Sequence, residues 1–575
     1  MVVSGASNDV FVQACCSSYY YYCAAAALVT LFVLYCTRMW HAVKERVGIC
    51  NYSSVGVGDR ASDILSKEDA KYVKTSTKMF RDTEKRQKNI SSYEGHANFV
   101  SDFLRQKVID VDGLMRQNTQ KLFLLHRESG PIVEGGLGVR ITVQLNLFGG
   151  SVANLGNESQ RKWLQGVFDR GELGCFALTE AGAGVLSGLV VNTTATYVPA
   201  TKKGKMGTFD LHSPTLKSRK TWISQGLTAK WAVVIARLIL PDNVDKGPHA
   251  FVVDISDSKS GICKEDMPSK TDFNGLDNAN IWFDHASLPA DSLLSGVSYI
   301  TGDGEYKLTD PNVPFRFVNV AQRLLSGRIC IAGAAIMQLR KVYDAVKSYA
   351  MKREIPTGKA SFTPLSDIPV MNDTLDGIDA SMCVFRHFVR SNEESFMGDD
   401  SISTDLVNRI ACGKVEIVGY CIDAILALKK RVGSLSLQST GPFGSQTDIL
   451  YVYRFAEGDS AILQQKMTRD ALKRIGSLPG ILRELLSVPF QILTNKHGLG
   501  SQRVRLSMAL VQMAIAMIGL SRKDKMKAWF DAHALVERIA KLTAMLTIYD
   551  SVCEREGLKG TRELLLFKKI HLETL

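Results

Sequence analysis

One carboxylate, Glu457, stands in the segment YRFAEGDSAILQQ (residues 453–465), directly before Gly458. Ser460 follows, a residue type that caps helices, and the apolar positions of a helical pattern begin at once. This arrangement aims a single acid at a fixed point. The more ordinary interpretation is a glutamate that caps a helix or complements its dipole.

A glycine-rich stretch, GCFALTEAGAGVLSGLVVNTTATY (residues 174–197), gathers small residues around Thr179 and Glu180. Gly182 and Gly184 would let the backbone approach a flat or anionic ligand closely. The stretch is not GxGxxG, and the sequence contains no GxxxxGK[ST]. Glycine-rich turns before strands are common, so this stretch alone identifies no site.

A tryptophan follows in SRKTWISQGLTAKWAVVIARL, where Trp222 lies between a turn and an apolar strand. An indole there could form the wall of a planar ring site, with the Ser224 hydroxyl bonding to the edge of the ring. The alternative is a tryptophan of the hydrophobic core.

Composition describes a globular protein of more than one domain, with 575 residues, 45% hydrophobic and 22% charged. The net charge of +12 is spread without a basic run or an aromatic-interleaved basic stretch, which argues against a nucleic-acid partner. The twelve cysteines contain no CxxC, and the ten histidines contain no HExxH. We therefore expect a reducing compartment and no metal.

Periodicity changes along the chain. Residues 62–173 are mostly helical in pattern, and Asn157 is a candidate cap. From Phe176 the segments TTATYV, KWAVVIARLIL, HAFVVDI and ANIWFDHASL predict short strands separated by turn residues.

Helical periodicity then returns. One long helix is predicted from apolar residues spaced three and four apart: Leu325, Ile329, Ala332, Ile336, Leu339, Tyr343, Val346 and Ala350. A second helix is predicted over residues 405–431, and the tail beyond Gly476 is helical again. The fold class expected is α+β.

The order of these motifs resembles the acyl-CoA oxidase branch of the acyl-CoA dehydrogenase superfamily. The matching pieces, in order, are ITVQLNLFGGSVANLGNESQRKWL, LTEAGAG, KTWISQG, GPHAFVVDI, NGLDNANIWFDHASLPADSLL, GVSYITGDGEYK, SGR and AEGDSAILQQ. The resemblance covers roughly Gly95 to the C-terminus. It implies an N-terminal helical domain (62–173), a β-barrel or β-sandwich domain (174–300), a four-helix-bundle domain (301–476) and extra C-terminal helices (477–575), after a leading segment (1–61).

The resemblance also implies chemistry. A bound FAD would oxidise the α,β bond of an acyl-CoA thioester to the trans-2-enoyl form, and O2 would reoxidise the flavin to give H2O2, the first step of β-oxidation. Glu457 matches the acid that removes the α-proton. Its backbone N–H and a flavin hydroxyl would polarise the thioester oxygen, so Glu457 and Gly458 would contact the substrate.

The remaining site residues are carried over by motif. Thr179 and Gly184 would contact flavin or acyl-CoA, and Trp222 and Ser224 would line the isoalloxazine. Arg328, otherwise a helix-surface charge, would meet the FAD pyrophosphate across a homodimer interface. The resemblance assigns Gln438 and Gly441 to the glycine turn that helps hold the adenine half.

Several positions depart from the family pattern, and each one touches cofactor binding. Val185 stands where a hydroxyl is expected, Pro442 replaces a flexible glycine, and Ile368-Pro369 replaces an aromatic-Gln pair. The segment REIPTG (residues 353–358) stands where the family has an RxxFG element. These changes favour a second hypothesis, a non-catalytic scaffold or complex subunit, whereas the retained Glu457 favours an enzyme. Within the enzyme class the alternative is a dehydrogenase that passes electrons to a flavoprotein.

The N-terminus is not explained by the resemblance. Residues 10–37 carry no charge, and YYYYCAAAALVTLFVLYC (residues 19–36) is about long enough to cross a bilayer. Basic residues follow it, which would leave the bulk of the chain in the cytosol. The alternatives are a cleaved targeting segment, or translation from Met39. By resemblance the protein would be peroxisomal, with the mitochondrion as an alternative, although HLETL is not an SKL-type tail.

Overall fold

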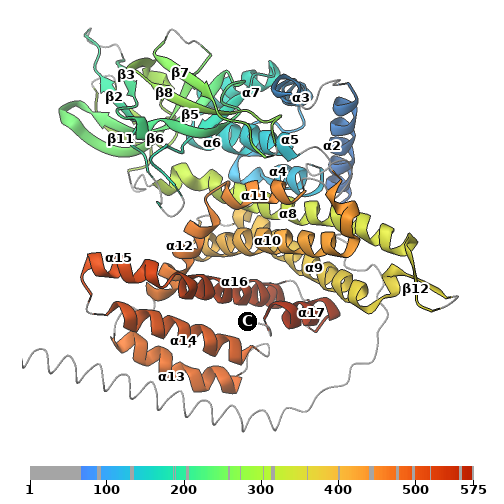
Figure 1. Ribbon diagram of the computed structural model, residues 1–575. Coiled ribbons are helices and arrows are strands. Elements are labelled where there is room, and N and C mark those ends of the chain that lie inside the picture. Colours follow the sequence, from blue (N-terminus) through green and yellow to red (C-terminus); the bar gives the residue numbers. More distant parts are fainter. Residues whose placement is uncertain are drawn as a thin grey trace, which may run out of the picture. The chain divides into compact units, whose positions relative to one another are not determined.

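In the computed structural model (Figure 1), the described residues, which begin at residue 66, belong to one compact unit. The structure describes residues 66–86, 92–129, 135–184, 187, 190–201, 206–256, 260–271, 273–301, 304–311, 317–358, 361–398, 402–438, 446–473, 475, 478–494, 499–518, 520–555, 558 and 560–572. The apolar segment at residues 19–36 lies outside these ranges. So do Val185, Gly441 and Pro442. Within the described ranges, no helix has the length and apolarity needed to span a membrane.

The predicted N-terminal helices are confirmed. They are α2 (Lys67–Arg86), α3 (Tyr93–Arg105), α4 (Gln120–Leu124), α5 (Gly135–Ile141), α6 (Gly150–Leu155) and α7 (Glu158–Asp169). Asn157 begins α7 as predicted. Its side chain accepts from the backbone N–H of Gln160, and the Gln160 side chain accepts from the Asn157 N–H, which makes a reciprocal capping box.

The predicted strands form two main sheets, drawn mostly in green in Figure 1. The strands are β1 (Gly174–Ala177), β2 (Thr194–Val198), β3 (Thr208–His212), β4 (Lys220–Ser224), β5 (Trp231–Leu240), β6 (Val244–Asp254), β7 (Ile262–Asp266), β8 (Asn278–Phe283) and β9 (Ala286–Pro289). One sheet has the order β1-β5-β2-β3-β9, with β6 also paired to β5, and the other has the order β4-β8-β7. Two hairpins follow: β10 (Ser298–Ile300) with β11 (Tyr306–Leu308), and β12 (Glu354–Pro356) with β13 (Phe362–Pro364).

Three long helices pack on one another: α8 (Phe317–Lys352), α9 (Pro369–Gly398) and α10 (Thr404–Val432). All eight apolar residues predicted to form one face of the first of these helices are buried, as the spacing requires. Pro369 is the first residue of α9, a position where the missing N–H costs nothing. The Ile368-Pro369 departure therefore serves as a helix start in this chain.

The remainder is helical, as predicted. Two short helices, α11 (Gln446–Phe455) and α12 (Ser460–Lys473), lead to α13 (Leu478–Thr494), α14 (Gly500–Met517), α15 (Arg522–Asp531), α16 (His533–Arg555) and α17 (Arg562–His571). Helix α16 packs on α9, α10, α12 and α14, and α17 packs on α9, so the tail is built onto the helical bundle. The division into four domains at the predicted boundaries stays a prediction.

Candidate active site

Glu457 lies in the tight turn between α11 and α12. Both Glu457 (φ 56°) and Gly458 (φ 97°) have left-handed backbone conformations. For a glutamate this conformation costs of the order of 1 kcal/mol, and it persists only where the surroundings impose it. The cap of α12 lies one residue before the predicted one. The side chain of Asp459, and not that of Ser460, accepts from the N–H of Ala461.

The Glu457 side chain is buried, with 7% of its surface exposed. Its Oε1 lies 3.5 Å from the Nδ2 of Asn146, a long contact. Its Oε2 is also buried, and no donor among the described residues reaches it. Gly327 of α8 makes this placement possible, because a Cβ there would lie 2.2 Å from Oε1.

Lys414 of α10 is hydrogen-bonded to the turn that carries Glu457. Its side chain is fully buried, and its Nζ donates to the carbonyl oxygens of Arg454 (2.7 Å) and Gly458 (2.9 Å) and to the hydroxyl of Ser460 (3.0 Å). The ammonium thus lies at the C-terminal end of α11, where the helix dipole favours a cation. Three bonds from one group fix both sides of the turn that carries Glu457.

Arg328 of α8 also contacts this turn. Its Nε donates to the carbonyl oxygen of Glu457 at 2.8 Å. Burial lowers the pKa of Arg328 to about 10. The predicted contact with a pyrophosphate stays a prediction, and within this chain part of the guanidinium is already bonded to the backbone of the proposed base.

Burial raises the pKa of Glu457 to about 8, although nearby Arg328, Lys414 and Arg323 oppose the shift. The reason lies in where these cations bond. Arg328 and Lys414 donate to peptide carbonyls of the turn and not to the carboxylate. Burial also lowers the pKa of Lys414, to about 7. The carboxyl group is therefore poised to exchange a proton near neutral pH.

The residues predicted to face a flavin lie together at the start of the β domain. Thr179 is exposed, and its carbonyl oxygen accepts from the N–H of Thr221 at 2.9 Å. The neighbouring Trp222 is 57% exposed and has a left-handed backbone (φ 55°). The Ser224 hydroxyl accepts from the Asn278 amide at 3.1 Å. An exposed indole on a strained strand is unlike a core tryptophan, and it leaves an aromatic face free.

A buried ion pair fixes this corner. The Nζ of Lys220 lies 2.9 Å from Oε1 of Glu180, and both side chains are fully buried. The Glu180 carboxylate also accepts from the N–H groups of Asn192 and Thr193. Three residues from two other segments, Lys220 and the adjacent Asn192 and Thr193, thereby hold the residue directly after Thr179 in place.

The helical and β parts of the site share one short element, the π-helix η5 (Thr142–Gly149). Its Gln144 side chain accepts from the N–H of Gly174 (2.8 Å) and from the side chain of Gln225 (3.0 Å), next to the Trp222 strand. Two residues later, Asn146 reaches Glu457. Wide helical turns of this kind occur often at functional sites.

The structure also describes two further predicted residues, Gly184 and Gln438. Gly184 is exposed, and its N–H donates to the Ser187 hydroxyl at 3.0 Å. Gln438 is exposed after α10. Gly441 lies outside the described residues, so the predicted adenine turn stays a prediction.

Sequence reasoning missed Asn146, Gly327, Lys414 and Arg323 as members of the site. Asn146 and Gly327 do lie within quoted motifs, ITVQLNLFGG and SGR, but nothing in those motifs distinguishes them. Lys414 sits in an ordinary helical pattern, and a lysine among apolar neighbours is the one signal that the sequence offers for it.

No family model matches the chain. Among curated proteins, it is 29% identical over 376 residues to a peroxisomal protein of Arabidopsis thaliana named acyl-coenzyme A oxidase 2, covering 62% of this chain and 53% of that protein. It is 31% identical over 265 residues to Homo sapiens peroxisomal acyl-coenzyme A oxidase 3, a match that covers 45% of this chain and 37% of the human protein. The chain thus spans about half, or less, of the length of these relatives.

Solved structures with similar folds include acyl-CoA oxidases and acyl-CoA dehydrogenases. The acyl-CoA oxidase 3 of Yarrowia lipolytica superposes with a TM-score of 0.69 at 18% identity, covering 88% of this chain and 78% of that one. An acyl-CoA dehydrogenase of Bacillus anthracis, complexed with FAD, superposes with a TM-score of 0.68 at 15% identity. This match covers 89% of this chain and 87% of the dehydrogenase. At these identities the likeness establishes the fold, which is that of the acyl-CoA dehydrogenases and oxidases.

Proposed function

Because this chain is related to the acyl-CoA oxidases and has their fold, we propose that it oxidises an acyl-CoA thioester to the trans-2-enoyl-CoA with FAD as cofactor and O2 as electron acceptor. The observation that carries the proposal is Glu457, a buried carboxylate on a strained turn, one oxygen of which has no partner among the described residues. A carboxylate placed in this way is expensive for stability, and function is the usual reason to keep it.

Glu457 removes the α-proton of the substrate in this proposal. A base of pKa about 8 is better matched to a carbon acid than an exposed glutamate, and the thioester carbonyl makes the α-proton more acidic. The hydrogen bond from Arg328 and the three from Lys414 hold the turn, so that the carboxylate needs no reorganisation when substrate binds. The N–H of Glu457 is the proposed donor to the thioester oxygen.

The described residues fit FAD on the β side of the site. Trp222 offers an exposed aromatic face, and the exposed Thr179 and half-buried Ser224 offer hydroxyls beside it. These residues would hold the isoalloxazine, with Gly184 nearby, and Arg328, Gln438 and Gly441 are proposed for the rest of the cofactor. When bound, FAD supplies the hydride acceptor for the β-carbon.

The relatives named peroxisomal suggest the same compartment for this chain, and the family arrangement suggests a homodimer. A dehydrogenase that uses a flavoprotein as acceptor, or a scaffold without activity, would leave the fold unchanged. Acceptor choice depends on solvent access to the reduced flavin, so these alternatives are separated by experiment.

The test is anaerobic reduction of the purified, FAD-loaded protein by saturated acyl-CoA substrates, followed at the flavin absorbance band. We expect bleaching, and on admission of air one H2O2 for each enoyl-CoA formed. Glu457→Gln should keep flavin and ligand binding but lose bleaching by orders of magnitude. A protein that takes up no FAD supports the scaffold, and bleaching without H2O2 supports the dehydrogenase. Undiminished bleaching by the Gln variant would remove Glu457 from its role.

A further inference from the structure

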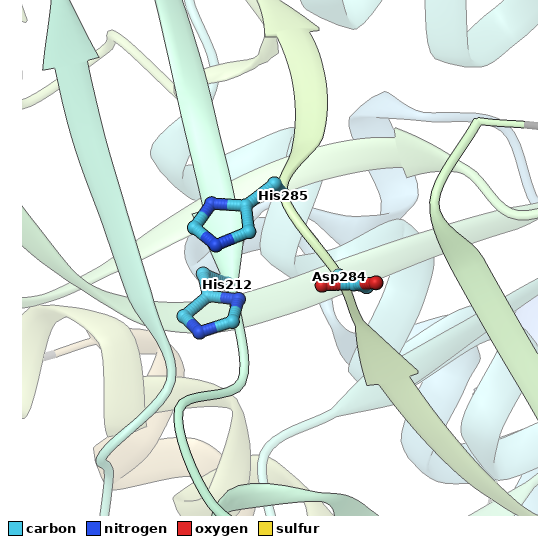
Figure 2. Close-up of side chains that lie close together, drawn as sticks. All are labelled: His212, Asp284 and His285. Atoms are coloured by element: carbon cyan, nitrogen blue, oxygen red, sulfur yellow. The ribbon is translucent and has the colours of Figure 1, made fainter.

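The β domain carries a cluster of metal-ligating side chains that is separate from the proposed active site. His212, Asp284 and His285 each offer one ligand atom, and these atoms all lie within 4.8 Å of one another. Figure 2 shows the two imidazole rings one above the other, with the Asp284 carboxylate beside them. The sequence alone predicts no metal because these residues come from distant segments and match no spacing motif.

The backbone of the cluster is fixed where the chain passes from β8 into β9. The Asp284 N–H donates to the Gly261 carbonyl oxygen, and the Ser213 N–H donates to that of Phe283, both at 2.8 Å. His285, in the left-handed region at φ 52°, makes the corner between the two sheets. His212 is the last residue of β3, which pairs with β9. The ligating side chains therefore project from anchored positions and not from a free loop.

A fourth residue, Asp210, contacts the imidazole ring of His285. Its Oδ2 lies 2.9 Å from Nδ1 of His285. If that nitrogen donates to the carboxylate, the proton is held on Nδ1 and the lone pair is left on Nε2. Metal-binding histidines characteristically have a carboxylate in this position, which fixes the tautomer and makes the ring more basic.

The second histidine has an unsatisfied atom. Nδ1 of His212 is buried and has no hydrogen-bond partner in the described part of the chain. The two rings stack with centroids 4.0 Å apart and planes inclined by 12°. In this arrangement the two rings lie face to face, so a shared ion requires one ring to turn about its Cβ–Cγ bond. Asp210 holds the ring of His285, so the ring that turns is that of the half-buried His212.

We propose that His212, His285 and Asp284 form a binding site for Zn2+, with Asp210 as the residue that orients His285. Two imidazoles and one carboxylate are a ligand set that suits zinc, and three protein ligands leave a fourth position for water. The ion would tie β3 to the corner that precedes β9. This site is independent of the proposed oxidation, and its test does not depend on flavin or acyl-CoA.

The experiment is calorimetric titration of the full-length protein with ZnCl2, after removal of any histidine tag and treatment with EDTA. We expect one equivalent to bind with a Kd on the order of 1–10 µM. His212→Ala and His285→Ala should each abolish this binding event, and Asp210→Ala should weaken it by about 10–100-fold. His533→Ala, at an exposed histidine of α16, is the matched control and should bind as the wild type does.

Circular dichroism verifies that each variant folds, and His212→Gln or His285→Gln replaces any alanine variant that does not. Co2+ provides a second readout, because a bound ion with nitrogen and oxygen ligands absorbs in the visible without the intense thiolate band that cysteine ligands produce. No zinc binding by the wild type would overturn the proposal. Binding that persists in both histidine variants would do so too, since the ion would then lie elsewhere.

Discussion

Gly327 of α8 occupies the position where any side chain would collide with the carboxylate of Glu457, since a Cβ there would lie 2.2 Å from Oε1 and 2.8 Å from Nδ2 of Asn146. We predict that Gly327→Ala displaces the carboxylate and lowers the rate of anaerobic flavin reduction by about 100-fold. Gly419→Ala on α10 is the control, because its new methyl group would meet nothing within 4 Å. Equal rates in the two variants would contradict this account.

The raised pKa of Glu457 has a cost in stability that depends on pH. An unfolded glutamate ionises near pH 4.5, whereas the buried one stays protonated up to about 8. Between these values the folded state binds the extra proton, so wild-type stability falls as pH rises, by at most about 1.4 kcal/mol per pH unit. We predict that Glu457→Gln melts at nearly the wild-type temperature at pH 4.5 and at a progressively higher one toward pH 8. A difference independent of pH would indicate that the side chain is ionised in the folded protein.

Lys414 is predicted to act as a positioning residue. Lys414→Met removes three hydrogen bonds and a cation that lowers the pKa of Glu457. We expect slower flavin reduction, by about 10–100-fold, and a pH profile displaced to higher pH, while acyl-CoA affinity changes little. Lys473→Met, at an exposed lysine of α12, is the control. A variant that lost activity with an unshifted pH profile would point to a merely structural role.

Arg328→Ala separates two interpretations of this arginine. If it reaches a neighbouring subunit's FAD, the variant should lose FAD retention and dimer stability together. If its main role is the hydrogen bond to the Glu457 carbonyl, the variant should keep FAD but show a pH profile displaced upward. FAD content after gel filtration, the apparent mass and the pH dependence of flavin reduction measure the three effects. A variant unchanged in all three would leave Arg328 as an ordinary helix charge.

Much of the fold could be predicted because local patterns agree with tertiary burial. The eight apolar positions of α8 lie on one face and are all buried, and the Asn157 cap forms as expected. Caps and periodicity are properties of a few neighbouring residues, so sequence carries them directly.

The site could be predicted only where a motif labels it. The EGD motif singles out Glu457, but the dependence of this residue on Gly327 and Lys414 arises from contacts between residues far apart in the chain. The same limit applies to His212 and His285, which no spacing rule connects. The resemblance assigns Arg328 to the cofactor, whereas its bond to the turn of the base emerges only when α8 and α11 are packed together.

The π-helix η5 makes the active site sensitive to helical phase. The N–H of Gly150 reaches back five residues to the carbonyl of Leu145, so this element accommodates more residues per turn than an α-helix does. Loss of one residue within it would replace this wide turn with ordinary α-helical winding and so change the angular spacing of its side chains around the helix axis. Gln144 and Asn146 could then no longer serve the β domain and Glu457 at once, so chain length in this short segment is as constrained as the identity of any single side chain.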